Sequence, residues 1–241
     1  MPYLTWIADD NLKVCVREVL SKGVAGIKKA DKNFYRNGVD PFSAVFDATC
    51  QSISLEQWLH FERQRQAQKT LQNALGNFHQ KLLSQVKDWE IPALGYVDLI
   101  SDKAKIVAEI KNKHNTVKKS DLKNVYDELQ SAVMHKTSKY QGYTAYYVTV
   151  IPASEKRFDK EFTPSDNETK TVRQASKQIR EIDGYSFYAL ATGQHDALKQ
   201  LYLVLPQVIQ ELLVEQNAPL KQTTELSQAP LFAELFAKAF G

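Results

Sequence analysis

Two acidic side chains and a lysine stand in the middle of the chain with a spacing that suits metal-dependent hydrolysis. Asp98 precedes a β-prone segment that contains Glu109 and Lys111. Because side chains two apart share one face of a strand, Glu109 and Lys111 should point the same way. Two carboxylates suit Mg²⁺, which binds them together with water and substrate phosphate. The lysine can then hold or deprotonate the attacking water and stabilise the negative charge that develops on the phosphate.

The same three residues have a simpler interpretation as an exposed strand face with an ion pair between positions i and i+2. The residue types alone favour this simpler interpretation, since surface ion pairs are common and contribute little. The catalytic hypothesis therefore depends on the elements around the cluster and on the residues that follow Lys111.

The elements around the cluster are predicted to be two strands joined by a short turn. Residues 96–100 and 105–111 have strand patterns, and residues 101–103 form the turn, so a hairpin would bring Asp98 beside the second strand. A helix is predicted to begin at Ser120-Asp121 and to be ended by Gly142. Residues 143–151 and 185–191 are predicted to be further strands.

The first ninety residues are predicted to be helical. A helical rhythm runs from residue 12 to 20 and stops near Gly23. A second helix begins at Asp40-Pro41 and carries Phe42, Val45 and Phe46 on one face. A capping box formed by Ser54 and Gln57 opens a long helix to about residue 86.

The rest of the chain contains a polar segment and two helices. Residues 152–170 are predicted to form a long loop or flap, 196–213 a helix kinked or broken at Pro206, and 230–240 a short closing helix. Strands that alternate with helices, behind a helical N-terminal part, predict an α/β or α+β fold around a central mixed sheet. We expect one domain over 1–241, with a helical part (1–90), a core and flap (91–215) and a C-terminal helix (216–241).

Composition limits the possible functions. Lys and Arg number 31 against 28 Asp and Glu, and a net charge of +3 does not by itself indicate a nucleic-acid partner. Both cysteines, Cys15 and Cys50, lie in apolar helical patterns and are expected to be buried thiols of a cytoplasmic protein. No apolar run could cross a membrane, no Walker-type loop indicates ATP, and neither cysteine has zinc-ligand spacing.

The central cluster and the run that follows it resemble a known group of nucleases. Asp98 with Glu109-Ile110-Lys111 resembles the PD-(D/E)xK signature, although Val97 stands where the signature's name has proline. The run 109–116, EIKNKHNT, is similar to type II restriction endonucleases, in particular those that cut GGNCC or GGWCC sites. Residues 75–80 and 182–193 are similar to the same group, so the resemblance covers about residues 55–215.

This resemblance implies a restriction-endonuclease-like core and a homodimer that cuts a short palindromic duplex with Mg²⁺, leaving 5′-phosphate and 3′-hydroxyl ends. Asp98 and Glu109 would be metal ligands, the Ile110 carbonyl a third ligand, and Lys111 the residue that orients water. A further catalytic glutamate from an N-terminal helix is also implied. Glu62 is the candidate for it, with His79 and Gln80 as rivals.

Several polar residues are candidates for contact with DNA. The segment directly after the catalytic strand supplies Lys113, His114, Asn115, Thr116, Lys118 and Lys119. Its lysines would neutralise phosphates, while Asn115 would bond a base edge or a phosphate. Arg157 and Arg173, in and after the flap, are candidates for bonding guanine in the major groove. For Arg63, Arg65 and Lys69, a solvated helix face is favoured over phosphate contact.

Two alternatives stay open beside the site-specific endonuclease. A structure-specific or repair nuclease could use the same core and cut without regard to base sequence. A DNA-binding module without catalytic activity could keep the fold alone, although all three charged positions of the signature are intact.

Overall fold

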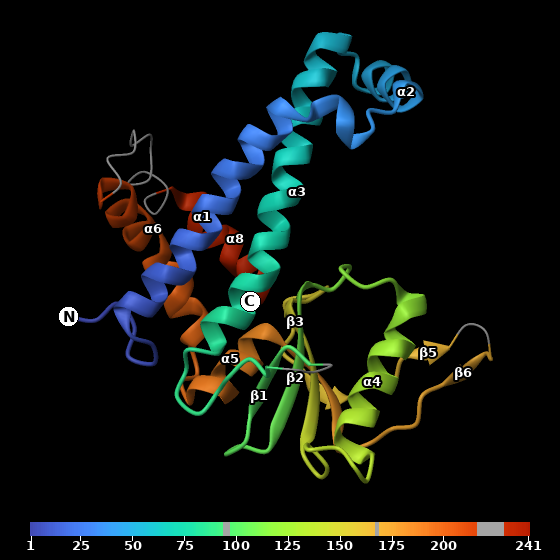
Figure 1. Cartoon of the computed structure of the whole chain (residues 1–241), viewed down its shortest axis with the longest axis vertical. Coiled ribbons are helices and arrows are strands. Elements are labelled where there is room, and N and C mark those ends of the chain that lie inside the picture. Colours follow the sequence, from blue (N-terminus) through green and yellow to red (C-terminus); the bar gives the residue numbers. More distant parts are fainter. Residues whose placement is uncertain (94–96, 167–168, 216–228) are drawn as a thin grey trace. The chain divides into compact units, whose positions relative to one another are not determined.

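The helices and strands fall into two units in the computed structural model, which describes residues 1–93, 97–166, 169–215 and 229–241 (Figure 1). One unit combines Met1–Val14 with His79–Gly241 and contains the strands. The other, Cys15–Phe78, is helical. The helical N-terminal region and the α/β class predicted from the sequence are therefore confirmed.

The centre of the larger unit is a mixed five-stranded sheet in the order β1-β2-β3-β7-β4. The three inner strands run parallel and the two outer strands antiparallel to them. The strands are β1 (Leu99–Ser101), β2 (Ile106–Lys113), β3 (Thr144–Ile151), β7 (Ile179–Asp183) and β4 (Asp159–Glu161). Parallel neighbours need a crossover, and α4 (Leu122–Met134) provides it between β2 and β3.

Helices cover both faces of this sheet. On one face, Tyr126, Leu129 and Val133 of α4 pack into a buried cluster with Val107 and Ile179 of the strands, and Figure 1 shows α4 along this side. On the other face lies α5 (Gly184–Thr192), whose aromatic side chains contact β3 and Trp89. Burial on both faces explains why the inner strands are almost continuously apolar.

Two further helices complete this unit. Helix α6 (Ala197–Glu215) packs against α5, and α8 (Pro230–Phe240) meets α6 where Tyr202 stacks on Phe232, with ring centroids 4.2 Å apart. The closing helix is as predicted. Of the kink or break predicted at Pro206, the break is wrong, because α6 continues through this residue. Pro206 is buried, and tertiary packing rather than propensity supplies most of the stability of a helix.

The predicted strand at 185–191 is also wrong, because this segment is helix α5. Asp183 caps its start by accepting a hydrogen bond from the Ser186 N–H at 2.9 Å, and Gly193 ends it with φ 72°. The neighbouring strand is β7, one element earlier. The aromatic residues of this segment suggested a strand because such residues are common in strands. In the structure they are buried in a helix, and burial favours aromatic side chains in either conformation.

The helical unit contains most of α1 (Asp9–Lys32) and α3 (Leu55–Leu83), with η1 (Phe34–Asn37) and α2 (Pro41–Gln51) between them. Asp40 caps α2, and the Ser54–Gln57 capping box is confirmed by bonds of 3.2 and 3.0 Å. Helix α1 does not stop near Gly23. A Cβ there would lie 3.4 Å from Leu71, and one on Gly26 would lie 2.9 Å from Thr70. The glycines allow α1 and α3 to pack closely.

The connections around α4 and the flap differ from the prediction. A short 3₁₀ turn, η2 (Lys119–Asp121), precedes α4, and Asp121 makes no side-chain capping bond. Helix α4 ends at Met134, well before Gly142, whose N–H instead donates to the Val133 carbonyl at 2.9 Å. The flap contains β4 and then β5 (Ser165–Asp166), which pairs with β6 (Thr171–Val172).

Three remaining predictions concern the two cysteines, membrane-spanning helices and segments that lie outside the described residues. Cys15 is buried as expected, but Cys50 is exposed on α2, so the prediction of two buried thiols is half wrong. Within the described ranges, no helix has the length and apolar character needed to span a membrane. Tyr96, the first residue of the predicted strand, and residues 216–228 of the predicted C-terminal part lie outside the described residues.

Candidate active site

A β-hairpin brings the predicted catalytic residues together. Asp98 directly precedes β1, which pairs antiparallel with β2, and its N–H donates to the Ala108 carbonyl at 2.9 Å. Its Oδ2 accepts a hydrogen bond of 2.8 Å from the backbone N–H of Ile110. Strand β1 is held on its other side by Glu90, through two backbone bonds of 2.9 Å with Ile100. The Asp98 carboxylate is therefore fixed to the backbone of β2.

Glu109 and Lys111 lie on one face of β2, as the strand period predicts. The Lys111 ammonium donates to Glu109 Oε1 in an ion pair whose side chains are 25% and 15% exposed. Ile110 is buried on the opposite face. Because both charged side chains are largely withdrawn from water, this is not the exposed surface pair of the simpler interpretation.

The negative charge of Asp98 makes ionisation of the Glu109 carboxyl less favourable. Burial, then the charge of Asp98 and a hydrogen bond to it, raise the pKa of Glu109 from 4.5 to about 7, although Lys111 opposes the shift. Burial works to lower the pKa of Lys111, but the bond to Glu109 and the nearby negative charges raise it overall. A site that holds two close carboxylates and a lysine can bind a cation and stabilise an anion.

Few side chains at this site could act as metal ligands. In the described part of the chain, no cluster of three or more His, Cys, Asp and Glu side chains has the geometry to hold a metal. Two carboxylates are nevertheless enough for Mg²⁺, which keeps several waters and takes its other ligands from substrate phosphate. The mutual repulsion of Asp98 and Glu109 would be relieved by a divalent cation, so these residues fit such an ion.

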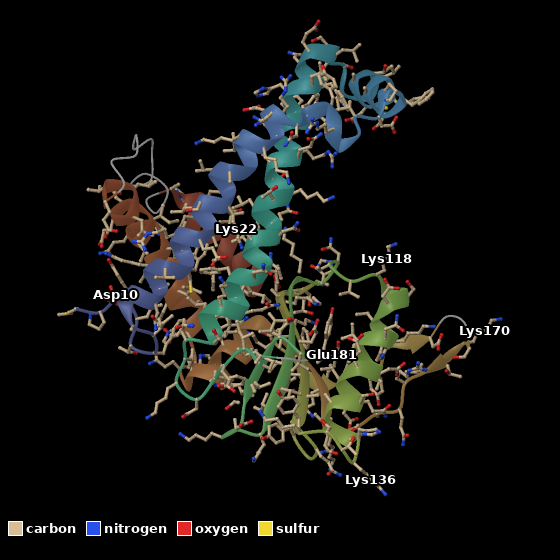
Figure 2. The ribbon with its side chains drawn as sticks, in the orientation of Figure 1. Asp10, Lys22, Lys118, Lys136, Lys170 and Glu181 are labelled. Atoms are coloured by element: carbon tan, nitrogen blue, oxygen red, sulfur yellow. The ribbon has the colours of Figure 1, made fainter. Side chains whose placement is uncertain are left out.

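The segment after β2 is exposed. Lys113, His114, Asn115 and Thr116 form a turn in which the Lys113 N–H donates to Thr116 Oγ1 at 3.2 Å. Lys118 and Lys119 follow in and before η2, and Figure 2 shows Lys118 at the start of α4, at the opposite end from Lys136. The structure thus brings these predicted DNA-binding residues together, next to the end of the strand that carries Glu109 and Lys111.

The two arginines proposed to recognise guanine are bonded to other parts of the chain. Arg173 makes a bidentate pair with Asp127 of α4, at 2.9 and 2.7 Å, and also contacts Asp166 at 3.4 Å. Arg157 lies 3.8 Å from Asp183 and 3.4 Å from the centre of the Tyr185 ring. The bidentate pair occupies two donor nitrogens of Arg173, whereas Arg157 makes only the longer contacts.

A comparison with known proteins identifies the group to which this chain is related. The family model described as Eco47II restriction endonuclease matches residues 4–214. The chain belongs to this family.

Two relatives of this Eco47II family match along nearly the whole chain. The type II restriction enzyme Eco47II of Escherichia coli is 39% identical over 242 residues, covering 100% of both chains. The type II restriction enzyme Sau96I of Staphylococcus aureus is 30% identical over 242 residues, covering 98% of this chain and 89% of its own. No solved structure gives a significant match. The resemblance to type II restriction endonucleases found in the sequence is confirmed.

In this member of the Eco47II family, the candidates for an additional catalytic residue have other bonds. Glu62 belongs to the helical unit, where its carboxylate accepts two bonds of 2.6 Å from Arg65, which lower its pKa. His79 is partly buried and lies 2.7 Å from the Tyr188 hydroxyl, and the desolvation of its ring lowers its pKa to about 4. Gln80 is partly buried. The bond between His79 and Tyr188 joins α3 to α5.

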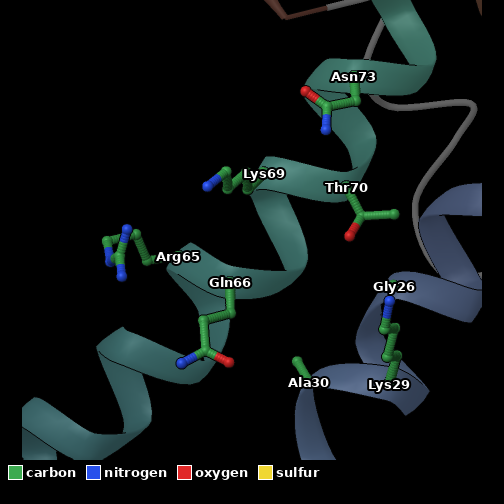
Figure 3. A pocket seen from close by; sticks show the side chains of 8 residues that line it. All are labelled: Gly26, Lys29, Ala30, Arg65, Gln66, Lys69, Thr70 and Asn73. Atoms are coloured by element: carbon green, nitrogen blue, oxygen red, sulfur yellow. The ribbon is translucent and has the colours of Figure 1, made fainter. Parts of the chain in front are cut away.

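The helical unit of the Eco47II-family chain has a basic pocket between α1 and α3. Figure 3 shows Lys29, Arg65 and Lys69 around it, with Gln66, Thr70 and Asn73. The predicted solvated face of α3 is thus partly a concave surface. Arg63 lies elsewhere, 4.8 Å from the centre of the Phe34 ring.

Sequence reasoning missed Tyr147 as a neighbour of the site. It lies beside Glu109 in the register of β2 and β3, and its buried hydroxyl has no hydrogen-bond partner among the described residues. Strands β2 and β3 are separated by a helix, so the sequence does not indicate the register that pairs Glu109 with Tyr147.

Proposed function

We propose that this chain is a Mg²⁺-dependent type II restriction endonuclease that hydrolyses a short palindromic duplex site of the GGNCC or GGWCC type. The cluster of Asp98, Glu109 and Lys111 on one hairpin, in a chain of the Eco47II family, carries this proposal. The type of site comes from the resemblance of the run 109–116 and its neighbours. The products would have 5′-phosphate and 3′-hydroxyl ends.

Asp98 and Glu109 would hold the metal, which when bound withdraws charge from the scissile phosphate and acidifies a water. The carbonyl of Ile110 is the third proposed ligand. In a strand, the N–H and C=O of one residue leave the chain on the same side. Because the Ile110 N–H reaches Asp98, its carbonyl also leaves β2 toward Asp98, which supports this role.

Lys111 would act as a charged donor. Its pKa is raised by the bond to Glu109 and the nearby negative charges, which favours the ammonium form at neutral pH. It can orient the attacking water and stabilise the negative charge on the phosphate as the bond breaks. Its ion pair with Glu109 holds it in position before DNA arrives.

The other parts of the proposal concern DNA contact and assembly. The exposed residues from Lys113 to Lys119 would grip phosphates beside the catalytic strand. Arg157 and Arg173 would recognise guanines after leaving their present partners, and Glu62 would complete the active site. The chain would work as a cytoplasmic homodimer in which residues 1–241 form one endonuclease domain.

Digestion of a long plasmid in Mg²⁺ tests the function. Discrete fragments whose ends map to one GGNCC-type site would support the proposal. A smear would indicate a nuclease without sequence preference, and a mobility shift without cutting would indicate a binding module. A Glu109→Gln variant purified in parallel is the matched control, because cutting by that preparation would reveal a contaminating nuclease.

A further inference from the structure

An apolar face of α2 is exposed to water. Phe42, Val45 and Phe46 have exposed fractions of 77%, 57% and 71%. They follow the i, i+3, i+4 spacing that places side chains along one side of a helix. Two phenylalanines side by side in water are unfavourable for a chain that functions alone, and such patches usually mark an interface.

The opposite side of α2 is attached to the rest of the helical unit. Ala48 is buried, and Asp47 accepts a bond of 2.9 Å from the Trp58 indole N–H of α3. Asp40 caps the first turn through the N–H groups of Phe42 and Ser43. The helix is therefore held in one orientation, and its apolar face is a preformed surface.

The charges of this segment disfavour DNA as the partner. Between residues 37 and 62 the sequence has no lysine or arginine, but it has Asp40, Asp47, Glu56 and Glu62. Nucleic-acid surfaces depend on basic side chains that displace counterions from phosphates. A segment that is apolar and acidic instead fits a protein partner.

We infer that the apolar face of α2 is where a second copy of this chain docks, with the two α2 helices packed antiparallel around a two-fold axis. This inference rests on the proposed function. Cutting both strands of a palindrome requires two catalytic clusters related by a two-fold axis, and the described part of each chain supplies one set of Asp98, Glu109 and Lys111. A two-fold interface uses the same patch on both copies, so the patch must complement itself. A single apolar helix seam does so.

The area of the patch is consistent with the centre of a dimer interface. A fully buried phenylalanine hides roughly 150–250 Å². At the exposed fractions of Phe42 and Phe46, four such side chains from two copies would bury roughly 450–750 Å². A stable interface needs roughly 1,200 Å² or more. Val45 and a polar rim would have to supply the remainder.

Measurement of the molar mass in solution tests the inference. We expect the wild type to be a dimer by light scattering, and Phe46→Glu to weaken the dimer by roughly 100-fold or more, as loss of an aromatic hot spot does. Because Phe46 is exposed within the chain, the variant should stay folded and keep the wild-type far-ultraviolet circular dichroism spectrum, although loss of the dimer can lower its thermal unfolding midpoint. The matched control is Leu203→Glu, which changes a 54% exposed leucine on α6 and should stay dimeric. A monomeric wild type, a dimeric Phe46→Glu or a monomeric Leu203→Glu would overturn the inference.

The chain's exposed thiol provides a second measurement. Cys50 lies one turn after Phe46 on α2, whereas Cys15 is buried. In an antiparallel pair that crosses at Phe46, the two Cys50 residues would lie roughly 12 Å apart along the helix axis. A flexible bis-maleimide of that length should link wild-type dimers but not Cys50→Ser dimers. An unlinked wild-type dimer would refute this placement.

Plasmid cutting separates the two proposals. An enzyme that cuts but dimerises elsewhere refutes only the interface. A dimer through α2 that never cuts refutes only the function.

Discussion

Asp98 has two separable roles, and two substitutions distinguish them. It accepts a hydrogen bond from the Ile110 N–H and places a negative charge beside Glu109. Asp98→Ala removes both the acceptor and the charge. Asp98→Asn removes the charge but retains an amide oxygen that can accept the same hydrogen bond.

The structure sets the expected size of each effect. Ile110 is 2% exposed, so without Asp98 its N–H would lack a partner in a poorly hydrated strand. The cost of leaving such a donor unsatisfied is about 1–3 kcal/mol. Asp98→Ala should therefore unfold at lower urea concentration than the wild type, by that free energy. Asp98→Asn should keep the stability of the wild type, because the hydrogen bond remains and the repulsion with Glu109 is relieved.

Both variants should lose Mg²⁺-dependent cutting, because each leaves one carboxylate where the metal is proposed to need two. Urea unfolding gives the stabilities, and plasmid digestion gives the activities. Equal stability of the two variants would show that the bond to Ile110 contributes nothing. Cutting by Asp98→Asn at the wild-type rate would remove Asp98 from the metal site.

Three further predictions follow from the site. Lys111→Ala should cut about 10²–10³ times more slowly and still bind DNA in Ca²⁺; cutting at the wild-type rate would exclude Lys111 from the mechanism. The pKa of Glu109 is about 7 in the folded chain and about 4.5 in the unfolded chain. The stability that protonated Glu109 contributes is therefore present below pH 4.5 and is lost as pH rises through 7. The free energy of unfolding of Glu109→Gln, measured in urea, should lack this pH dependence. Lys118→Ala or Lys119→Ala should lower the slope of the logarithm of the DNA-binding constant against the logarithm of salt concentration by about one on any duplex. Arg157→Ala or Arg173→Ala should instead cost about 1–3 kcal/mol of binding free energy on the cognate site alone. Equal losses on a scrambled duplex would exclude the arginines from sequence recognition.

The parts of the site that could be predicted from the sequence are local. The two-residue period places Glu109 beside Lys111, and a short turn is enough to return Asp98 to the same strand. Caps are equally local, which is why the start of the long helix at Ser54 was predicted correctly. These features depend on residues within a few positions of one another.

The features that the sequence did not reveal depend on distant residues. Gly23 stops a helix by propensity, but here it allows α1 to approach α3, which lies more than forty residues away. The pair between Arg173 and Asp127 joins two elements that no local pattern relates. The exposure of Phe46 could not be foreseen either, because helical spacing shows which side chains share a face and not what covers that face.

The short strand β1 has a consequence for the behaviour of the site on warming. Asp98 is positioned by only three residues of strand, which are paired to β2 and bridged to Glu90. Proteins open locally before they unfold globally, and segments with few buried contacts open at a lower free energy than core strands. Opening of β1 would withdraw Asp98 while the inner strands stay folded. Amide hydrogen exchange should therefore be faster at Leu99 and Ser101 than in β3, and activity should decline at temperatures below the global unfolding midpoint.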